Sequence, residues 1–177
     1  MNYWSQCGAK VVLRVPEGDS HPRHVCPRCG EIHYLNPKLV IGCVAEWEER
    51  ILLCRRAIEP GHGLWTLPAG FMENGESAAQ AALRETAEEA CARVAIESLF
   101  ALVSIPHIDQ VHLFYRARML DAEFGAGEES LETRLFDEPR IPWDKLAFRS
   151  VAFCLEAYFS DRRCGAFGFH ESTLPPH

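Results

Sequence analysis

The stretch Gly70–Ala90, GFMENGESAAQAALRETAEEA, decides the fold, because its second half predicts a helix that carries charge in a fixed pattern. A helix turns by about 100° per residue, so residues three and four apart are neighbours on its surface. Glu85, Glu88 and Glu89 therefore share one face, and three carboxylates are expected in a single patch.

The same helix has a predicted beginning, end and buried face. Ser77, followed three residues later by Gln80, has the form of a capping box, so the helix is expected to run from about Ala78 to Ala92. The face opposite the carboxylates is expected to be buried, and its residues are Ala79, Leu83, Ala87 and Ala90. Three small residues are expected to extend the carboxylate face without blocking a ligand: Ala78, Ala81 and Ala82.

Two interpretations of the carboxylate patch remain open from the residues alone. A solvated acidic face is the usual fate of glutamates on an amphipathic helix, and Arg84, four residues before Glu88, offsets part of their repulsion. The alternative is a bound divalent cation, because Mg²⁺ prefers oxygen ligands and is commonly shared between carboxylates and substrate phosphates.

The spacing of the whole stretch resembles the Nudix box, a pattern of glycine, glutamate, an Arg-Glu pair and a Glu-Glu pair at fixed intervals. The residues in register are Gly70, Glu76, Arg84, Glu85, Glu88 and Glu89, and LWTLPAG precedes them. The match departs at its end, where Thr86 and Ala92 replace aliphatic residues and Cys91 replaces the closing glycine. Since a non-glycine residue in a left-handed cap costs about 1 kcal/mol, we expect this helix to run on by a residue or to end differently.

The resemblance implies a metal-dependent pyrophosphohydrolase and assigns roles within the box. The implied ligands of Mg²⁺ or Mn²⁺ are Glu85, Glu88, Glu89 and the carbonyl group of Gly70. Arg84 is expected to orient the glutamates, and Glu76 to brace the loop before the helix.

Other candidate residues lie outside the helix. The resemblance implies a general base either from the box itself or from a loop before a late strand. In the acidic loop GAGEESLE, Glu129 is favoured over Glu128 and Glu132, and at least two of the three are expected to be solvated surface residues. Arg55 and Arg56 are candidates for gripping a phosphate, with an ordinary surface ion pair as the alternative for each. Aromatic candidates for stacking on a base, for which a core position is the alternative, are Phe71, Trp65, Phe114 and Tyr115.

Apolar runs on both sides of the box predict a sheet. LVIGCVAEW and ILLCRR are typical of a hairpin, VAIESLFALVSI, VHLFYRARML and TRLF of further strands, and RSVAFCLEAYFSDR of a closing helix that begins near Ser150. Strands alternating with two helices predict an α/β domain. The resemblance implies the Nudix α/β/α sandwich with a mixed sheet.

Residues 1–37 differ in amino-acid composition and hydrophobic pattern from residues 38–177. They hold three cysteines and three histidines, are dense in proline, glycine and charge, and show no helical period. This composition predicts a small module held by something other than a core, with the boundary near Asn36-Pro37. The resemblance implies that it is a zinc-ribbon-like β module, followed by the Nudix hydrolase domain.

The cysteines of this module form one complete pair and one incomplete pair. HVCPRCG holds Cys26 and Cys29, whereas WSQCG holds Cys7 and has Trp4 where a matching cysteine is expected. A structural Zn²⁺ normally has four ligands. Three outcomes stay open: a metal-free ribbon in which Trp4 packs in place of the metal, water as the fourth ligand, or a histidine ligand from among His21, His24 and His33.

The resemblance extends over both modules to Nudix proteins with an N-terminal zinc ribbon, similar to the plant chloroplast FAD pyrophosphatases. The stretches that carry it are VPEGDS, CPRCGEIHYLNPKLVIGC, LLCRRAIEPGHGLWTLPAGFMENGES, GEESLETRLF and IPWDKLAFRSV. It implies hydrolysis of FAD to FMN and AMP, or of ADP-ribose to AMP and ribose 5-phosphate. An NADH pyrophosphatase is one alternative, although FALVSIPHIDQ stands where that subfamily carries SQPWPFPxS. A non-catalytic nucleotide-sensing regulator is the other.

Composition limits the partners. The chain has 177 residues, 47% of them hydrophobic, and a formal net charge of −7, which disfavours general nucleic-acid binding; residues 1–38 carry five Lys and Arg against three acids. No signal-like segment or membrane-spanning apolar run is evident, so we expect a cytoplasmic protein without membrane contact, with reduced cysteines. The expected partner is a small nucleotide, and the resemblance adds a homodimer.

Overall fold

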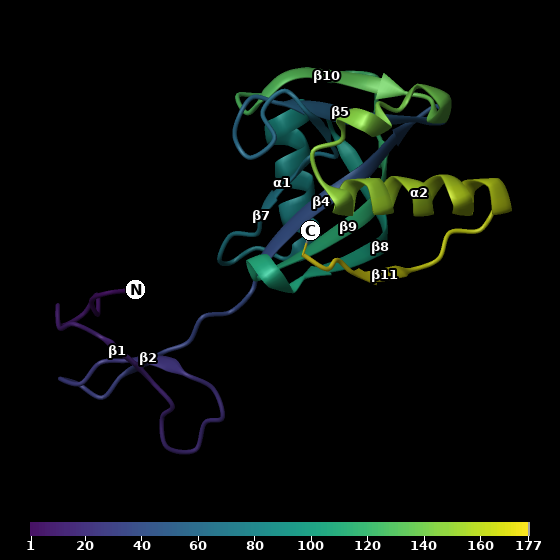
Figure 1. Ribbon diagram of the computed structural model, residues 1–177. Coiled ribbons are helices and arrows are strands. Elements are labelled where there is room, and N and C mark those ends of the chain that lie inside the picture. Colours follow the sequence, from purple (N-terminus) through teal and green to yellow (C-terminus); the bar gives the residue numbers. More distant parts are fainter. Residues whose placement is uncertain (177) are drawn as a thin grey trace. The chain divides into compact units, whose positions relative to one another are not determined.

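The computed structural model describes residues 1–176, which form two compact units, Met1–Asn36 and a larger unit that begins at Pro37 (Figure 1). Within the described residues, no helix is long and apolar enough to cross a membrane.

The smaller unit is a three-stranded antiparallel sheet with very little core. Its strands, in the order β1-β2-β3, are β1 (Val12–Arg14), β2 (Arg23–Val25) and β3 (Ile32–His33). The buried apolar residues of this unit are Val11, Val25 and Cys26. Such a small apolar core contributes little stability to three short strands.

The larger unit is built on one mixed sheet, with the strand order β10-β5-β4-β9-β8-β11. The β4–β9 and β8–β11 pairs are parallel and the other pairs are antiparallel, with β6 added to β5 and β7 added to β4. The strands are β4 (Lys38–Trp47), β5 (Arg50–Arg56), β6 (Trp65–Thr66), β7 (Ala69–Phe71), β8 (Val94–Ile105), β9 (Gln110–Met119), β10 (Ser130–Phe136) and β11 (His170–Thr173). The predicted hairpin is therefore β4–β5, and β11 is a strand that the sequence did not predict.

Two helices cover the two faces of this sheet, α1 (Ala78–Ala90) on one and α2 (Arg149–Cys164) on the other (Figure 1). Side chains alternate between the faces along a strand. On β5, Leu53 packs in the cluster that contains α2, whereas Leu52 and Cys54 pack in the cluster that contains α1. The α/β/α sandwich with a mixed sheet is thus confirmed.

The beginning of α1 agrees with the sequence. The side chain of Ser77 accepts a hydrogen bond from the backbone N–H of Gln80, and the side chain of Gln80 accepts one from the N–H of Ser77. Both halves of the capping box are present, so two N–H groups that the helix leaves free are satisfied.

The expected end of α1 is wrong, and so is its expected buried face except at Ala90, which is buried. The helix ends at Ala90, and Cys91 adopts the left-handed conformation (φ 49°) that the family glycine would take, with its N–H donating to Ala87. The residues buried against the sheet are Ala81, Ala82, Glu85, Thr86, Glu89 and Ala90, whereas Leu83 and Ala87 are exposed. The carboxylate side of the helix therefore faces inward. Thr86 fits there because its hydroxyl donates to the carbonyl oxygen of Ala82.

The strained cap yields a stability prediction. Cys91→Gly should raise the free energy of unfolding by about 1 kcal/mol, because glycine adopts a positive φ without a steric penalty. Urea denaturation of the variant and the parent measures the difference. Cys91→Ser removes the same thiol but keeps a side chain, so it should leave stability nearly unchanged. Equal stability of Cys91→Gly and Cys91→Ser would contradict the strain assigned to this cap.

Candidate active site

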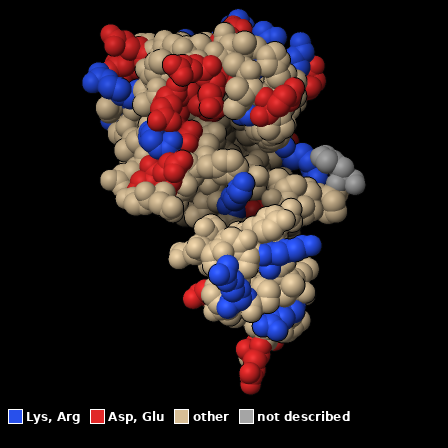
Figure 2. Space-filling model, turned by 90° about the vertical axis from the view of Figure 1, so that its left-hand side faces the viewer, with Lys and Arg blue, Asp and Glu red and all other residues tan. Residues whose placement is uncertain are grey.

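A cavity of about 1100 Å³ opens on the larger unit beside α1. One wall carries four residues of α1, Arg84, Glu85, Glu88 and Glu89, together with the backbone of β7. The other walls come from β9, the loop after β8, the loop after β5 and the first turn of α2. Figure 2 shows acidic side chains gathered on one face of this unit, with a basic side chain among them. The cavity therefore combines a charged wall with apolar ones.

The backbone of β7 holds two of the carboxylates. The N–H of Ala69 donates to Glu89 Oε2 at 2.9 Å. At Gly70 the Glu85 carboxylate lies so close to the backbone that a built Cβ would overlap both of its oxygens. Glycine is needed at this position for space, and its absence of a side chain lets Glu85 sit against the strand.

Arg84 is the centre of an ion-pair network at the mouth of the cavity. Its guanidinium donates to Glu76 at 2.7 Å, to Glu85 at 2.6 Å and to Glu88 at 3.0 Å, and also to the carbonyl oxygen of Phe71 at 3.0 Å. Hydrogen bonds from Arg84 lower the pKa of Glu76, and the same bonds raise the pKa of the guanidinium. Glu76 also accepts a hydrogen bond from the backbone N–H of Glu73 at 2.7 Å, within the loop before α1. The orienting role of Arg84 and the bracing role of Glu76 stay predictions that these contacts allow.

The carboxylates of Glu85 and Glu89 are buried, which disfavours their ionised forms. Burial raises the pKa of Glu89 to about 7, against a lowering by the Ala69 N–H, and burial likewise raises the pKa of Glu85 despite its bonds to Arg84. Their relative exposures are 5% and 8%. A buried carboxylate favours its neutral form unless a cation stands beside it. A cation bound beside Glu85 and Glu89 would therefore stabilise the ionised forms of both carboxylates.

This donor set suits a hard divalent cation. Glu85 and Glu89 supply buried carboxylate oxygens with raised pKa values, Glu88 adds an exposed one, and oxygen is the ligand that Mg²⁺ and Mn²⁺ prefer. Among the described residues, the three glutamates do not bring their oxygens within 4.8 Å of one another, since Arg84 lies between two of them. The chemistry of the site fits the metal, and the guanidinium acts as the counterion.

The acidic loop after β9 is fixed to the end of α1. The N–H of Gly125 donates to the carbonyl oxygen of Ala90 and that of Gly127 to Glu89, and a Cβ on Gly127 would overlap the carbonyl group of Glu88. This close docking brings Glu128 and Glu129 to the cavity wall, where both remain exposed. The predicted base Glu129 is therefore at the site.

The two arginines of β5 have different positions. Arg56 is buried at 8% exposure and lines the cavity; its Nε donates to the carbonyl oxygen of Pro60 at 2.7 Å. Arg55 is exposed, lies outside the lining, donates to Gly63 and faces Glu132 at 3.9 Å. Neighbouring strand residues point to opposite faces, so Arg56 lies at the cavity while Arg55 has the surface position of the alternative interpretation.

The aromatic candidates also differ in whether they line the cavity. Phe71 lines the cavity at 48% exposure, with the Lys38 ammonium 5.1 Å from its ring centroid, and the buried Phe114 lines it as well. Trp65 lies instead in the core, 4.9 Å from Phe136 between ring centroids. Phe71 is thus the exposed aromatic surface of the site.

Sequence reasoning did not predict the polar cluster around His112. Its Nδ1 lies 2.9 Å from Ser150 Oγ and its Nε2 lies 3.0 Å from Gln110 Oε1, and all three residues line the cavity. Burial lowers the pKa of His112 to about 4. No local pattern could have identified this cluster, because β9 and the first turn of α2 meet only in the folded chain.

The buried histidine makes a pH prediction. Unfolded His112 titrates near its ordinary pKa of about 6.5, so the unfolded chain binds more protons between about pH 4 and pH 6.5, and stability decreases as the pH is lowered through that window. This residue should account for about 2 kcal/mol of the loss between pH 6.5 and 4.5. Denaturant unfolding at both pH values should show that His112→Gln loses that much less than the parent. An equal loss in both proteins would contradict a neutral buried imidazole.

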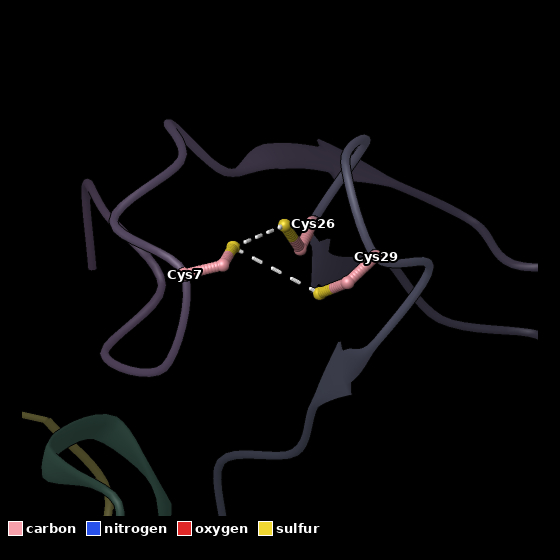
Figure 3. A group of neighbouring side chains, drawn as sticks. All are labelled: Cys7, Cys26 and Cys29. Carbon is pink, nitrogen blue, oxygen red and sulfur yellow. Dashed lines mark hydrogen bonds between the residues drawn. The ribbon is translucent and has the colours of Figure 1, made fainter.

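The smaller unit holds a separate cluster of three thiols. Cys7 Sγ lies 3.4 Å from Cys26 Sγ and 3.9 Å from Cys29 Sγ, and the three sulfur atoms point toward one another (Figure 3). Tetrahedral Zn–S bonds of about 2.3 Å place neighbouring sulfur atoms about 3.8 Å apart. Within residues 1–176, these cysteines are the one set of three or more potential metal ligands whose ligand atoms all lie within 4.8 Å of one another. The spacing of the sulfur atoms fits Zn²⁺.

Comparisons with known proteins agree with both units. Residues 2–35 match the model of the Nudix N-terminal zinc ribbon and residues 36–146 match the NUDIX domain. A crystal structure of a NUDIX hydrolase from Nitrosomonas europaea is 53% identical, with a TM-score of 0.95 over 98% of this chain and 99% of that one.

Two curated relatives carry named activities. An ADP-ribose pyrophosphatase of Methanocaldococcus jannaschii is 32% identical over 119 residues, which are 65% of this chain and 69% of that protein. The NAD-capped RNA hydrolase NudC of Pseudomonas aeruginosa is 28% identical over 177 residues, 98% of this chain but 59% of its own length. Because the NUDIX model covers more than half of the residues, the chain belongs to the Nudix family and is a Nudix pyrophosphohydrolase with an N-terminal zinc-ribbon segment.

Proposed function

We propose that this enzyme hydrolyses the pyrophosphate bond of a dinucleotide-like substrate, ADP-ribose or FAD, in a reaction that requires Mg²⁺ or Mn²⁺. The observation that carries the proposal is the cavity of about 1100 Å³ with carboxylates on one wall and aromatic and aliphatic side chains on the others. Sites for drug-sized ligands measure about 300–1000 Å³, so this volume suits a substrate with two large ends. The relative named ADP-ribose pyrophosphatase supports the same class.

The proposed chemistry is attack by water on one phosphorus and cleavage of the bridging P–O bond, which leaves two phosphate monoesters. A divalent cation held by Glu85, Glu88 and Glu89 would neutralise the pyrophosphate and lower the pKa of water. Glu129, exposed on the cavity wall, is the proposed acceptor of the proton that the water loses.

Two further residues are proposed to position the substrate. The Arg56 guanidinium lines the cavity, and among the described residues it has no carboxylate within 4.0 Å, so it is proposed to hold a substrate phosphate. The exposed ring of Phe71 is proposed to stack on a base or flavin ring.

A second candidate substrate is NADH or NAD. The similarity to a NAD-capped RNA hydrolase extends over 98% of this chain and includes the ribbon. Against it stands FALVSIPHIDQ, which replaces the signature expected of NADH pyrophosphatases.

Parallel assays with four substrates test which of these candidates the enzyme prefers. FAD, ADP-ribose, NADH and NAD are each supplied with Mg²⁺ and a phosphatase, and inorganic phosphate release gives kcat/KM. We expect the largest value for ADP-ribose or FAD. A larger value for NADH or NAD would favour the second candidate, and micromolar binding without turnover would favour a nucleotide sensor.

A further inference from the structure

The first nine residues fold like the strand-turn that carries Cys26 and Cys29. In the Cys26 turn, the N–H of Cys26 donates to the carbonyl oxygen of Glu31 at 2.9 Å, and the N–H of Gly30 donates to the carbonyl oxygen of Cys26 at 2.9 Å. In the turn that carries Cys7, the N–H of Trp4 donates to the carbonyl oxygen of Ala9 at 2.9 Å, and the N–H of Gly8 donates to the carbonyl oxygen of Trp4 at 2.9 Å.

The left-handed glycines complete this correspondence. Gly30 (φ 78°) directly follows Cys29, and Gly8 (φ 66°) directly follows Cys7. Both turns therefore have the same backbone form, in which Trp4 occupies the position of Cys26. The second turn keeps the geometry of a metal-binding knuckle at a position where its residue cannot ligate.

The nearby histidines do not fill the missing position. Among residues 1–176, no histidine nitrogen lies within 4.8 Å of all three sulfur atoms. His33 packs against Trp4, with ring centroids 5.7 Å apart, His24 stands opposite His33 in the β2–β3 register, and His21 contacts Ser20 at 2.8 Å. Each imidazole therefore has a position other than that of a fourth ligand.

The three thiols are arranged for a metal and not for a disulfide. A disulfide brings two sulfur atoms to about 2.05 Å, whereas the separations here fit tetrahedral coordination. Cys26 is buried and Cys29 is exposed, so one side of the cluster faces solvent. With three protein ligands, a tetrahedral ion retains one position for a ligand from solution, as catalytic zinc sites do.

We propose that the smaller unit binds one Zn²⁺ through Cys7, Cys26 and Cys29 and leaves its fourth position open to an exchangeable ligand such as water, imidazole or a small thiol. This site differs from a closed structural zinc site in that its metal is held less tightly and accepts an outside ligand. It is independent of the proposed nucleotide hydrolysis.

The matched variant is Trp4→Cys, which places a thiol at the position that the knuckle geometry reserves for a ligand. Full-length wild type and variant are loaded with Co²⁺, whose visible absorption reports its ligands, and titrated with imidazole. Imidazole should change the spectrum of the wild type and leave that of the variant unchanged. In competition with a chromophoric chelator, the variant should retain Zn²⁺ about tenfold or more tightly.

Three controls keep the result interpretable. Trp4→Phe, which adds no ligand, should respond to imidazole like the wild type even if Trp4→Cys fails to fold. Cys7→Ser should lose the metal, and replacement of the exposed Cys91 and Cys164 by serine should leave one metal per chain. A wild type that binds no metal, or whose cobalt spectrum does not respond to imidazole, would overturn the proposal.

Discussion

Glu89→Gln should reduce pyrophosphate hydrolysis by at least about 100-fold while the protein stays folded. The amide has nearly the same shape as the carboxylate and its oxygen can still accept the hydrogen bond from Ala69. What disappears is a negative charge at 5% exposure, next to Glu85, in the wall that is proposed to hold the cation. Because a buried charge is unfavourable, the melting temperature should not fall. Steady-state kinetics at saturating Mg²⁺ and thermal unfolding measure the two quantities.

Glu156→Gln is the matched control, since Glu156 is an exposed glutamate on α2 outside the cavity. It should keep full activity. If Glu89→Gln retained more than a tenth of wild-type activity, Glu89 would lose its assigned role.

Gly70→Ala should have a comparable effect by a different route. The added methyl group would overlap the Glu85 carboxylate, so Glu85 has to leave its place against β7. A displacement of about 1 Å at a catalytic group can cost about 100-fold, and we expect kcat to fall by that order. Circular dichroism should show unchanged helix content, because the clash involves a side chain at the cavity.

Gly168→Ala provides the comparison for this variant. A Cβ at Gly168 would approach Asp161 to 4.0 Å, which is ordinary contact, and no loss of activity is expected. Full activity of Gly70→Ala would show that Glu85 does not need its position against the strand.

The local sequence predicted those features that short-range physics controls. The capping box at Ser77 fixes where α1 begins, and alternating apolar residues fix β4, β5, β8 and β9. Helical spacing also predicted that Glu85, Glu88 and Glu89 share one side of α1, and all three line the cavity together with the predicted base Glu129.

The features that were missed depend on tertiary packing. Helical periodicity alone assigned Leu83 and Ala87 to the core, but the sheet covers the side that carries Glu85 and Glu89, because β7 offers backbone and space to these carboxylates. The His112–Ser150 contact joins positions 38 residues apart, so no short-range pattern encodes it. The left-handed Cys91 is tolerated because the loop after β9 satisfies the last carbonyl groups of α1.

The most direct measurement of the central claim is chromatographic detection of AMP from ADP-ribose and from FAD, with Mg²⁺ present and with it removed by EDTA. We predict that wild type releases AMP from at least one of them, that EDTA abolishes release and added Mg²⁺ or Mn²⁺ restores it, and that Glu89→Gln releases almost none. AMP formation that persists in EDTA, or that Glu89→Gln leaves intact, would contradict a carboxylate-held metal centre in this cavity.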